Sequence, residues 1–99
     1  MITSKQRAQL RALANPMETI FQVGKSGVSE KTAKQVEEAL EARELIKLRV
    51  LETCPQSARE AAQLLAERTG AAVIQVIGTR FVMFRQNQKE PKIKLEPKS

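Results

Sequence analysis

The feature that most constrains the fold is a short loop with a glycine at each end, Gly24-Lys25-Ser26-Gly27. A strand-like apolar run, residues 19–23, precedes this loop, and a helix-like pattern follows it from Ser29. Glycine permits positive φ and close approach of another backbone, and the free N–H groups of a helix N-terminus carry partial positive charge. The loop is therefore a candidate phosphate-binding site, although a plain strand-to-helix turn also fits this pattern.

Other sequence signals predict where the remaining helices and strands begin and end. Thr3 can cap a first helix that stops before Pro16. Ser57-x-x-Glu60 forms a capping box that opens a third helix, and Gly70 ends that helix. We expect Leu10, Leu13 and Ala14 to share one side of the first helix, and Ala61, Leu64 and Leu65 to be buried in the third. Residues 45–51 alternate as a strand does, and the pair Gly78-Thr79 predicts a type II′ hairpin between residues 72–77 and 80–85.

These elements predict an α/β fold, a compact α-β-α-β-α-β-β unit in which helices cover one face of a four-stranded mixed sheet. We expect one folded domain over residues 1–85. Residues 86–99 contain two prolines and only two large aliphatic side chains, too little apolar surface to fold alone. They are expected to form a basic, flexible tail.

The net charge of +6 lies at the two ends of the chain. The first helix carries Arg7 and Arg11 with no acid, the tail is basic, and residues 15–84 are neutral overall. Basic ends on a neutral core favour a polyanionic partner. Lys31 and Lys34 in the second helix add positive charge near the glycine loop. A cluster of glutamates in that helix is expected to be a solvated face: Glu37, Glu38, Glu41 and Glu44.

Missing residue types argue against catalysis. The chain has no histidine or aspartate, and Cys54 is its only cysteine, so the commonest general base and metal ligand are absent. We expect no enzyme activity, no metal and no cofactor. No apolar run is long enough to span a bilayer, so we expect a soluble, cytoplasmic protein with no membrane partner, and a monomer.

The chain resembles the CRM RNA-binding domain family in its single-domain bacterial YhbY-like form. The resemblance covers residues 3–85 and rests on several segments: Leu-Arg-Ala-Leu-Ala at 10–14, Val-Gly-Lys-Ser-Gly-Val at 23–28, Glu-Leu-Ile-Lys-Leu at 44–48, Thr-Gly-Ala at 69–71, Gln-Val-Ile-Gly at 75–78 and the closing Phe84-Arg85. Phe84 departs from the tyrosine that the family commonly has, and core packing is the expected role of all three phenylalanines.

The resemblance implies a fold like the C-terminal domain of bacterial translation initiation factor three, and binding of structured RNA. It also implies ribosomal RNA of the large-subunit precursor as the partner. On that basis Gly24, Lys25, Ser26 and Gly27 would contact RNA, and the surrounding charge would come from four more residues: Lys31, Lys34, Arg7 and Arg11. The alternative is a protein-interaction factor that docks on a ribosomal protein or an assembly GTPase and contacts RNA only through its tail.

Overall fold

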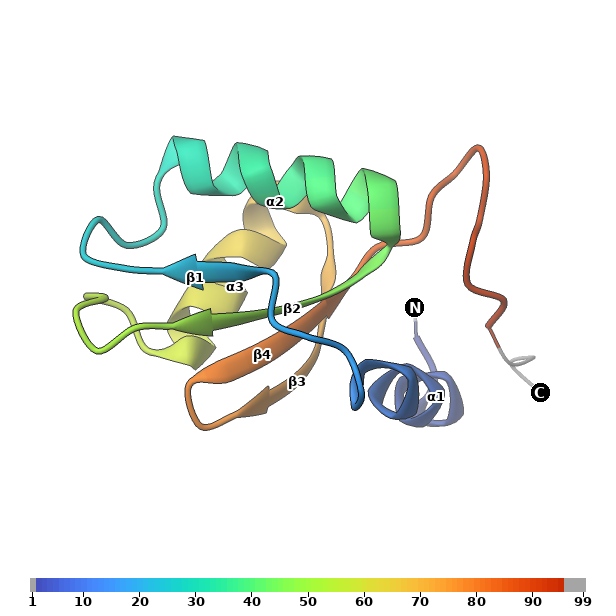
Figure 1. Cartoon of the computed structure of the whole chain (residues 1–99). Coiled ribbons are helices and arrows are strands. Elements are labelled where there is room, and N and C mark those ends of the chain that lie inside the picture. The colour runs from blue at the N-terminus through green and yellow to red at the C-terminus, as the bar shows by residue number, and fades with distance from the viewer. Residues whose placement is uncertain (1, 96–99) are drawn as a thin grey trace.

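The computed structural model describes residues 2–95, and its elements follow the expected order (Figure 1). They are α1 (Ser4–Ala14), β1 (Phe21–Val23), α2 (Glu30–Arg43), β2 (Leu45–Val50), α3 (Ala58–Thr69), β3 (Ala72–Ile77) and β4 (Arg80–Phe84). The four strands form one sheet in the order β1-β2-β4-β3. Because β1 runs parallel to β2 and the other pairs are antiparallel, the sheet is mixed, as expected.

The predicted start and stop signals act as helix caps. Thr3 and Gln6 form a reciprocal capping box at the start of α1, with both hydrogen bonds 3.1 Å long. Ser57 and Glu60 form the second box at α3, where the Glu60 N–H donates to Ser57 Oγ at 3.1 Å. Gly70 ends α3 with a φ of 76°, a conformation that glycine adopts without strain.

The capping box of α3 gives the fold a small dependence on pH. The Ser57 backbone N–H, and then the Ser57 hydroxyl, hydrogen-bond to the Glu60 carboxylate and lower its pKa below the ordinary value. This stabilisation is therefore present above the ordinary pKa of glutamate and is lost as the pH falls through the lowered pKa. The variant Glu60→Gln keeps a neutral acceptor at this position. Between neutral and acidic pH, its melting temperature should therefore fall less than that of the unmodified protein. An equal loss in both proteins would contradict this role of Glu60.

Helices α2 and α3 cover one face of the sheet and enclose the larger core cluster. Their apolar stripes meet side chains that alternate along β2 and β4. The cluster is built around fully buried residues: Val36 and Leu40 of α2, Ala61 and Leu65 of α3, Ile46 and Leu48 of β2, and Phe81 and Met83 of β4. Phe81 and Phe84 are buried and Phe21 packs against this cluster, so the expected core role of the phenylalanines is confirmed.

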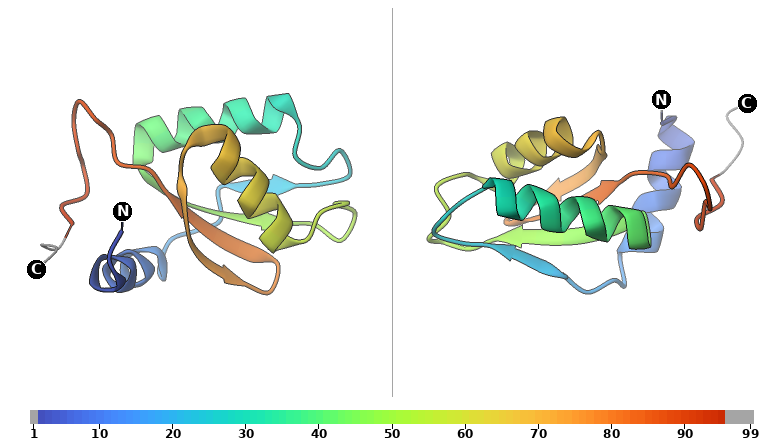
Figure 2. Two further views of the ribbon diagram at one scale, coloured as in Figure 1. Left: turned by 180° about the vertical axis from the view of Figure 1, so that it is seen from behind. Right: turned by 90° about the horizontal axis from the view of Figure 1, so that it is seen from above.

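Helix α1 packs against the opposite face, so the expectation that helices cover one face only was wrong (Figure 2). Leu10 and Ala14 of α1 are buried against Leu45, Val82 and Phe84, which point away from the larger cluster. These apolar side chains occupy the second face only at the end where β2 begins. The α1 helix therefore covers one end of this face and leaves the other end open.

Two leucines on the predicted apolar sides of α1 and α3 are exposed, and the expected burial of Leu64 was wrong. Leu13 is 45% exposed and Leu64 is 40% exposed. The buried stripe of α1 instead runs through Gln6, Leu10 and Ala14, at spacings of four residues. In α3 the buried stripe follows the helical repeat and leaves Leu64 at its edge: the buried residues are Ala58, Ala61, Ala62, Leu65 and Thr69.

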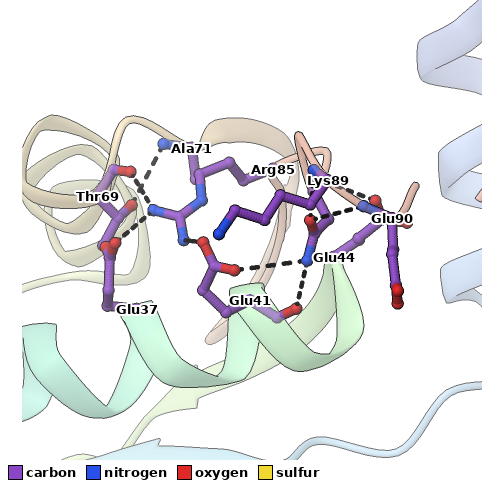
Figure 3. Close-up of polar contacts among 9 residues, drawn as sticks. Glu37, Glu41, Glu44, Thr69, Ala71, Arg85, Lys89 and Glu90 are labelled. Carbon is purple, nitrogen blue, oxygen red and sulfur yellow. Dashed lines mark hydrogen bonds and ion pairs between the residues drawn. The ribbon is translucent and has the colours of Figure 1, made fainter. Parts of the chain in front are cut away.

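Glu44 is buried rather than solvated, which corrects the expectation for the glutamate cluster (Figure 3). It is 0% exposed, and its carboxylate accepts three backbone N–H groups from the segment after β4. Asn87 N–H donates to Oε2 at 2.6 Å, and Lys92 and Ile93 N–H donate to Oε1 at 2.8 and 2.7 Å. Residues 86–95 form no helix or strand, yet Glu44 anchors them at both ends.

Arg85 uses its charge inside the fold (Figure 3). Its guanidinium donates to Glu37 at 2.7 Å, to Glu41 at 3.1 Å and to the Thr69 carbonyl at 2.7 Å. Arg85 therefore adds no free charge to the tail that follows it, in which every basic residue is a lysine. Lys98 and the other residues from 96 to 99 lie outside the described part, and flexibility of the tail stays a prediction.

Candidate nucleic-acid interface

The glycine loop forms a tight turn between β1 and α2. The Gly27 N–H donates to the Gly24 carbonyl at 2.9 Å, and the two residues between them, Lys25 and Ser26, are exposed. Within residues 2–95 the backbone N–H groups of Lys25 and Ser26 have no hydrogen-bond partner. The turn therefore offers two adjacent donors to an anion.

Gln56 holds this loop in place from the neighbouring connection between β2 and α3. Its Oε1 accepts the Val28 N–H at 3.1 Å, and the two connections extend side by side from the same end of the molecule (Figures 1 and 2). The sequence reasoning missed Gln56, because its distance along the chain from the loop carries no local signal. Gln56 is thus a positioning residue for the loop.

The two glycines of the loop have different structural requirements. Gly27 has a φ of 66°, and a Cβ there would lie 2.9 Å from Pro55 Cγ and would clash with Gln56 Oε1. Gly24 has no positive φ, and a Cβ there would make an ordinary contact, 3.5 Å from Leu51 Cδ1. The fold therefore requires glycine at 27 but not at 24.

The first two turns of α2 add further positive charge near the loop. Ser29 caps the helix, its Oγ accepting the Thr32 N–H at 3.3 Å. Lys31 and Lys34 are exposed and, like Lys25, form no ion pair with any residue from 2 to 95. Glu30, the acid of the first turn of α2, pairs with Arg68 of α3.

Arg7 and Arg11 lie at the other end of the sheet, so the structure does not bring them to the loop (Figure 1). Helix α1 packs where β2 begins, whereas the loop follows Val23, which pairs with Val50 at the end of β2. The length of β2 separates the two regions by about 17 Å. Arg7 also has a structural role, because its Nη1 donates to the Val73 and Ile74 carbonyls at 2.6 and 3.2 Å.

Two other features are absent from residues 2–95, a metal site and a membrane-spanning helix. In residues 2–95 no three acidic or cysteine side chains lie close enough together to ligate a metal ion. None of the helices in this part of the chain has the length and hydropathy needed to cross a membrane.

Comparisons with known proteins agree with the fold. The model of the CRS1 / YhbY (CRM) domain matches residues 2–85. The chain is 40% identical to the probable RNA-binding protein YqeI of Bacillus subtilis (strain 168), covering 96% of this chain and 99% of the relative. An RNA-binding protein of Haemophilus influenzae is 30% identical, with 98% and 97% covered. The solution structure of a hypothetical protein from Staphylococcus aureus superimposes with a TM-score of 0.79 at 41% identity, covering 97% of this chain and all of the other.

Proposed function

Because the chain belongs to the CRS1 / YhbY (CRM) domain family, we propose that it is a non-catalytic RNA-binding protein that contacts phosphates through its glycine loop. One observation carries this proposal. Among residues 2–95, the backbone N–H groups of Lys25 and Ser26 have no hydrogen-bond partner, and the lysines near this loop have no acidic partner. Names of the relatives indicate RNA-binding proteins rather than enzymes.

The chemistry of the loop favours recognition of the RNA backbone over recognition of bases. Two adjacent N–H groups can donate to one phosphate, and the lysine ammonium groups of Lys25, Lys31 and Lys34 supply charge without base-specific geometry. A folded RNA helix hides its major groove and presents phosphates and 2′-hydroxyls. We therefore expect shape to matter more than base sequence.

Within this proposal, the RNA is ribosomal RNA of the large-subunit precursor, and the protein acts as a cytoplasmic monomer in subunit assembly. The family resemblance noted in the sequence supports this choice of RNA. Arg7 and Arg11 belong to the same interface only if one RNA extends from the loop along β2 to α1. Of the two, Arg11 has the freer side chain, because it is exposed while Arg7 bonds to carbonyls of β3.

The loop is tested by the double variant Lys25→Asp with Ser26→Asp. We expect affinity for large-subunit ribosomal RNA transcribed in vitro to fall at least about 100-fold, because carboxylates replace the cation and repel the phosphate from the N–H groups. Both residues are exposed, so the melting temperature should stay nearly unchanged. Filter binding over a salt series measures the affinity.

A matched control for charge is the variant Gln88→Asp with Lys89→Asp. It changes the net charge by the same amount at two exposed tail residues. We expect it to retain most of the affinity. Loss of binding in the tail variant with full binding in the loop variant would contradict the proposal and support the alternative, in which the tail alone contacts RNA.

A further inference from the structure

A second cationic surface lies on the open part of the sheet, on the face that α1 covers only at one end. Alternation along the strands places six side chains on this open face: Gln22, Lys47, Arg49, Gln75, Ile77 and Arg80. Three of the six are cations and none is an acid. None of them was among the RNA-binding residues that the sequence predicted.

Arg49 and Arg80 face each other across neighbouring strands. They are direct partners in the antiparallel register of β2 and β4, and neither forms an ion pair with any residue in the described part of the chain. Like charges placed directly opposite in a sheet oppose folding. An anion between the two guanidinium groups would remove this repulsion, so the pair is better suited to a bound phosphate than to the free protein.

A hollow adjoins Arg80 where the sheet meets the end of α1. It has a volume of about 190 Å³ and is lined in part by Asn15, Lys47, Gln75, Ile77 and Arg80. Lys47 Nζ donates to the Asn15 carbonyl at 3.3 Å, which holds its ammonium group at the rim. Ile77 is 64% exposed, so its aliphatic side chain adds accessible apolar surface to this lining.

The lining combines the groups that one unpaired nucleotide requires. The cations can hold its phosphate, Ile77 offers an apolar surface to the flat base, and the amide side chains of Asn15 and Gln75 can hydrogen-bond to base edges. A duplex cannot supply such a base, because its bases are stacked and paired.

From this arrangement we propose that the open sheet face binds a single-stranded RNA segment, with a phosphate between Arg49 and Arg80 and one base in the hollow beside Ile77. The inference rests on the proposed RNA-binding function and adds a second contact to it. The segment would lead from the glycine loop, at the end of β2, toward Arg11 on α1, and so connect the two ends of the predicted interface.

The test uses two RNA probes, a hairpin and the same hairpin with a single-stranded oligouridylate extension. We expect the extension to strengthen binding to the unmodified protein. The double variant Arg49→Gln with Arg80→Gln should lower the affinity for the extended hairpin at least about tenfold. The slope of log affinity against log salt should decrease by about 0.7, because one phosphate contact to the single strand is lost. The melting temperature should be unchanged or higher, because the repulsion is gone.

Two further variants separate charge from contact. Ile77→Gln should weaken binding of the extended probe without changing the salt slope. The control variant Arg43→Gln with Lys89→Gln makes the same change of net charge at two exposed residues outside the strands. In this variant the extension should still strengthen binding as it does in the unmodified protein. In nuclear magnetic resonance titrations with oligouridylate, the amides of Lys47, Arg49 and residues 75–80 should shift.

The inference is overturned if the extension adds no affinity, or if the paired arginine variant and Ile77→Gln both bind the extended probe as the unmodified protein does. Hairpin binding that still depends on Lys25 and Ser26 would then leave the proposed function standing. The two proposals therefore fail separately.

Discussion

Replacing Glu44 with alanine is expected to lower the free energy of unfolding by about 3 kcal/mol and to detach residues 86–95 from the core. The carboxylate accepts three backbone N–H groups, and each donor left without an acceptor costs about 1 kcal/mol or more. Chemical denaturation measures the loss of stability. Hydrogen exchange at Asn87, Lys92 and Ile93 measures the detachment, since these amides should lose their protection.

The backbone at Glu44 makes this prediction specific to the carboxylate. Glu44 has a φ of 66° and a ψ of −48°, a conformation that is costly for any residue with a Cβ. Alanine keeps this cost and loses the acceptor, whereas Glu44→Gly loses the acceptor but relieves the strain by about 1 kcal/mol. Glu44→Gln keeps one acceptor oxygen and should fall between alanine and the unmodified protein. Unchanged stability and unchanged protection in the alanine variant would contradict the anchoring role.

Because Glu44 anchors residues 86–95, this part of the tail is expected to contribute to the stability of the domain. Ile93 and Leu95 pack against the smaller core cluster beneath α1, which consists of Leu10, Ala14, Leu45, Ile74, Val82 and Phe84. Deleting the tail would therefore expose apolar surface and destabilise the domain, in addition to removing charge. Substituting its exposed lysines separates the two effects, which is why the control for RNA binding uses Lys89 and leaves residues 92–95 in place.

Local signals allowed most of the fold to be predicted. Caps at Thr3 and Ser57, the ending at Gly70 and the hairpin glycine Gly78 each depend on neighbours within a few residues, and the structure has all of them. The side of the sheet that α1 covers could not be predicted in the same way. It depends on which face of β4 carries Phe84, and thus on strand order and register.

Long-range contacts also explain what was missed at the candidate site. Gln56 contacts the loop across 28 positions of sequence, and Glu44 binds backbone groups more than 40 positions away. Arg7 was grouped with the loop because of its charge, but its guanidinium binds carbonyls of β3. Charge in a sequence indicates a polyanionic partner, whereas the fold decides which cations remain free to bind it.

Alanine is expected to lower the free energy of unfolding much more at Gly27 than at Gly24. Gly27→Ala should lower the free energy of unfolding by about 2 to 3 kcal/mol, from strain at positive φ and from loss of the bond between Val28 N–H and Gln56. Gly24→Ala should change stability by less than about 1 kcal/mol, because the fold has room for a Cβ there.

The RNA affinity of the Gly24→Ala variant then tests whether Gly24 allows close approach of a phosphate. If a phosphate approaches the loop backbone closely, the added methyl group at Gly24 should weaken RNA binding about tenfold in a protein that is as stable as the unmodified one. Denaturation and filter binding on the two alanine variants measure both effects. Full RNA affinity in Gly24→Ala would mean that no phosphate passes close to that end of the loop, and contact would then have to be confined to Lys25, Ser26 and the first turn of α2.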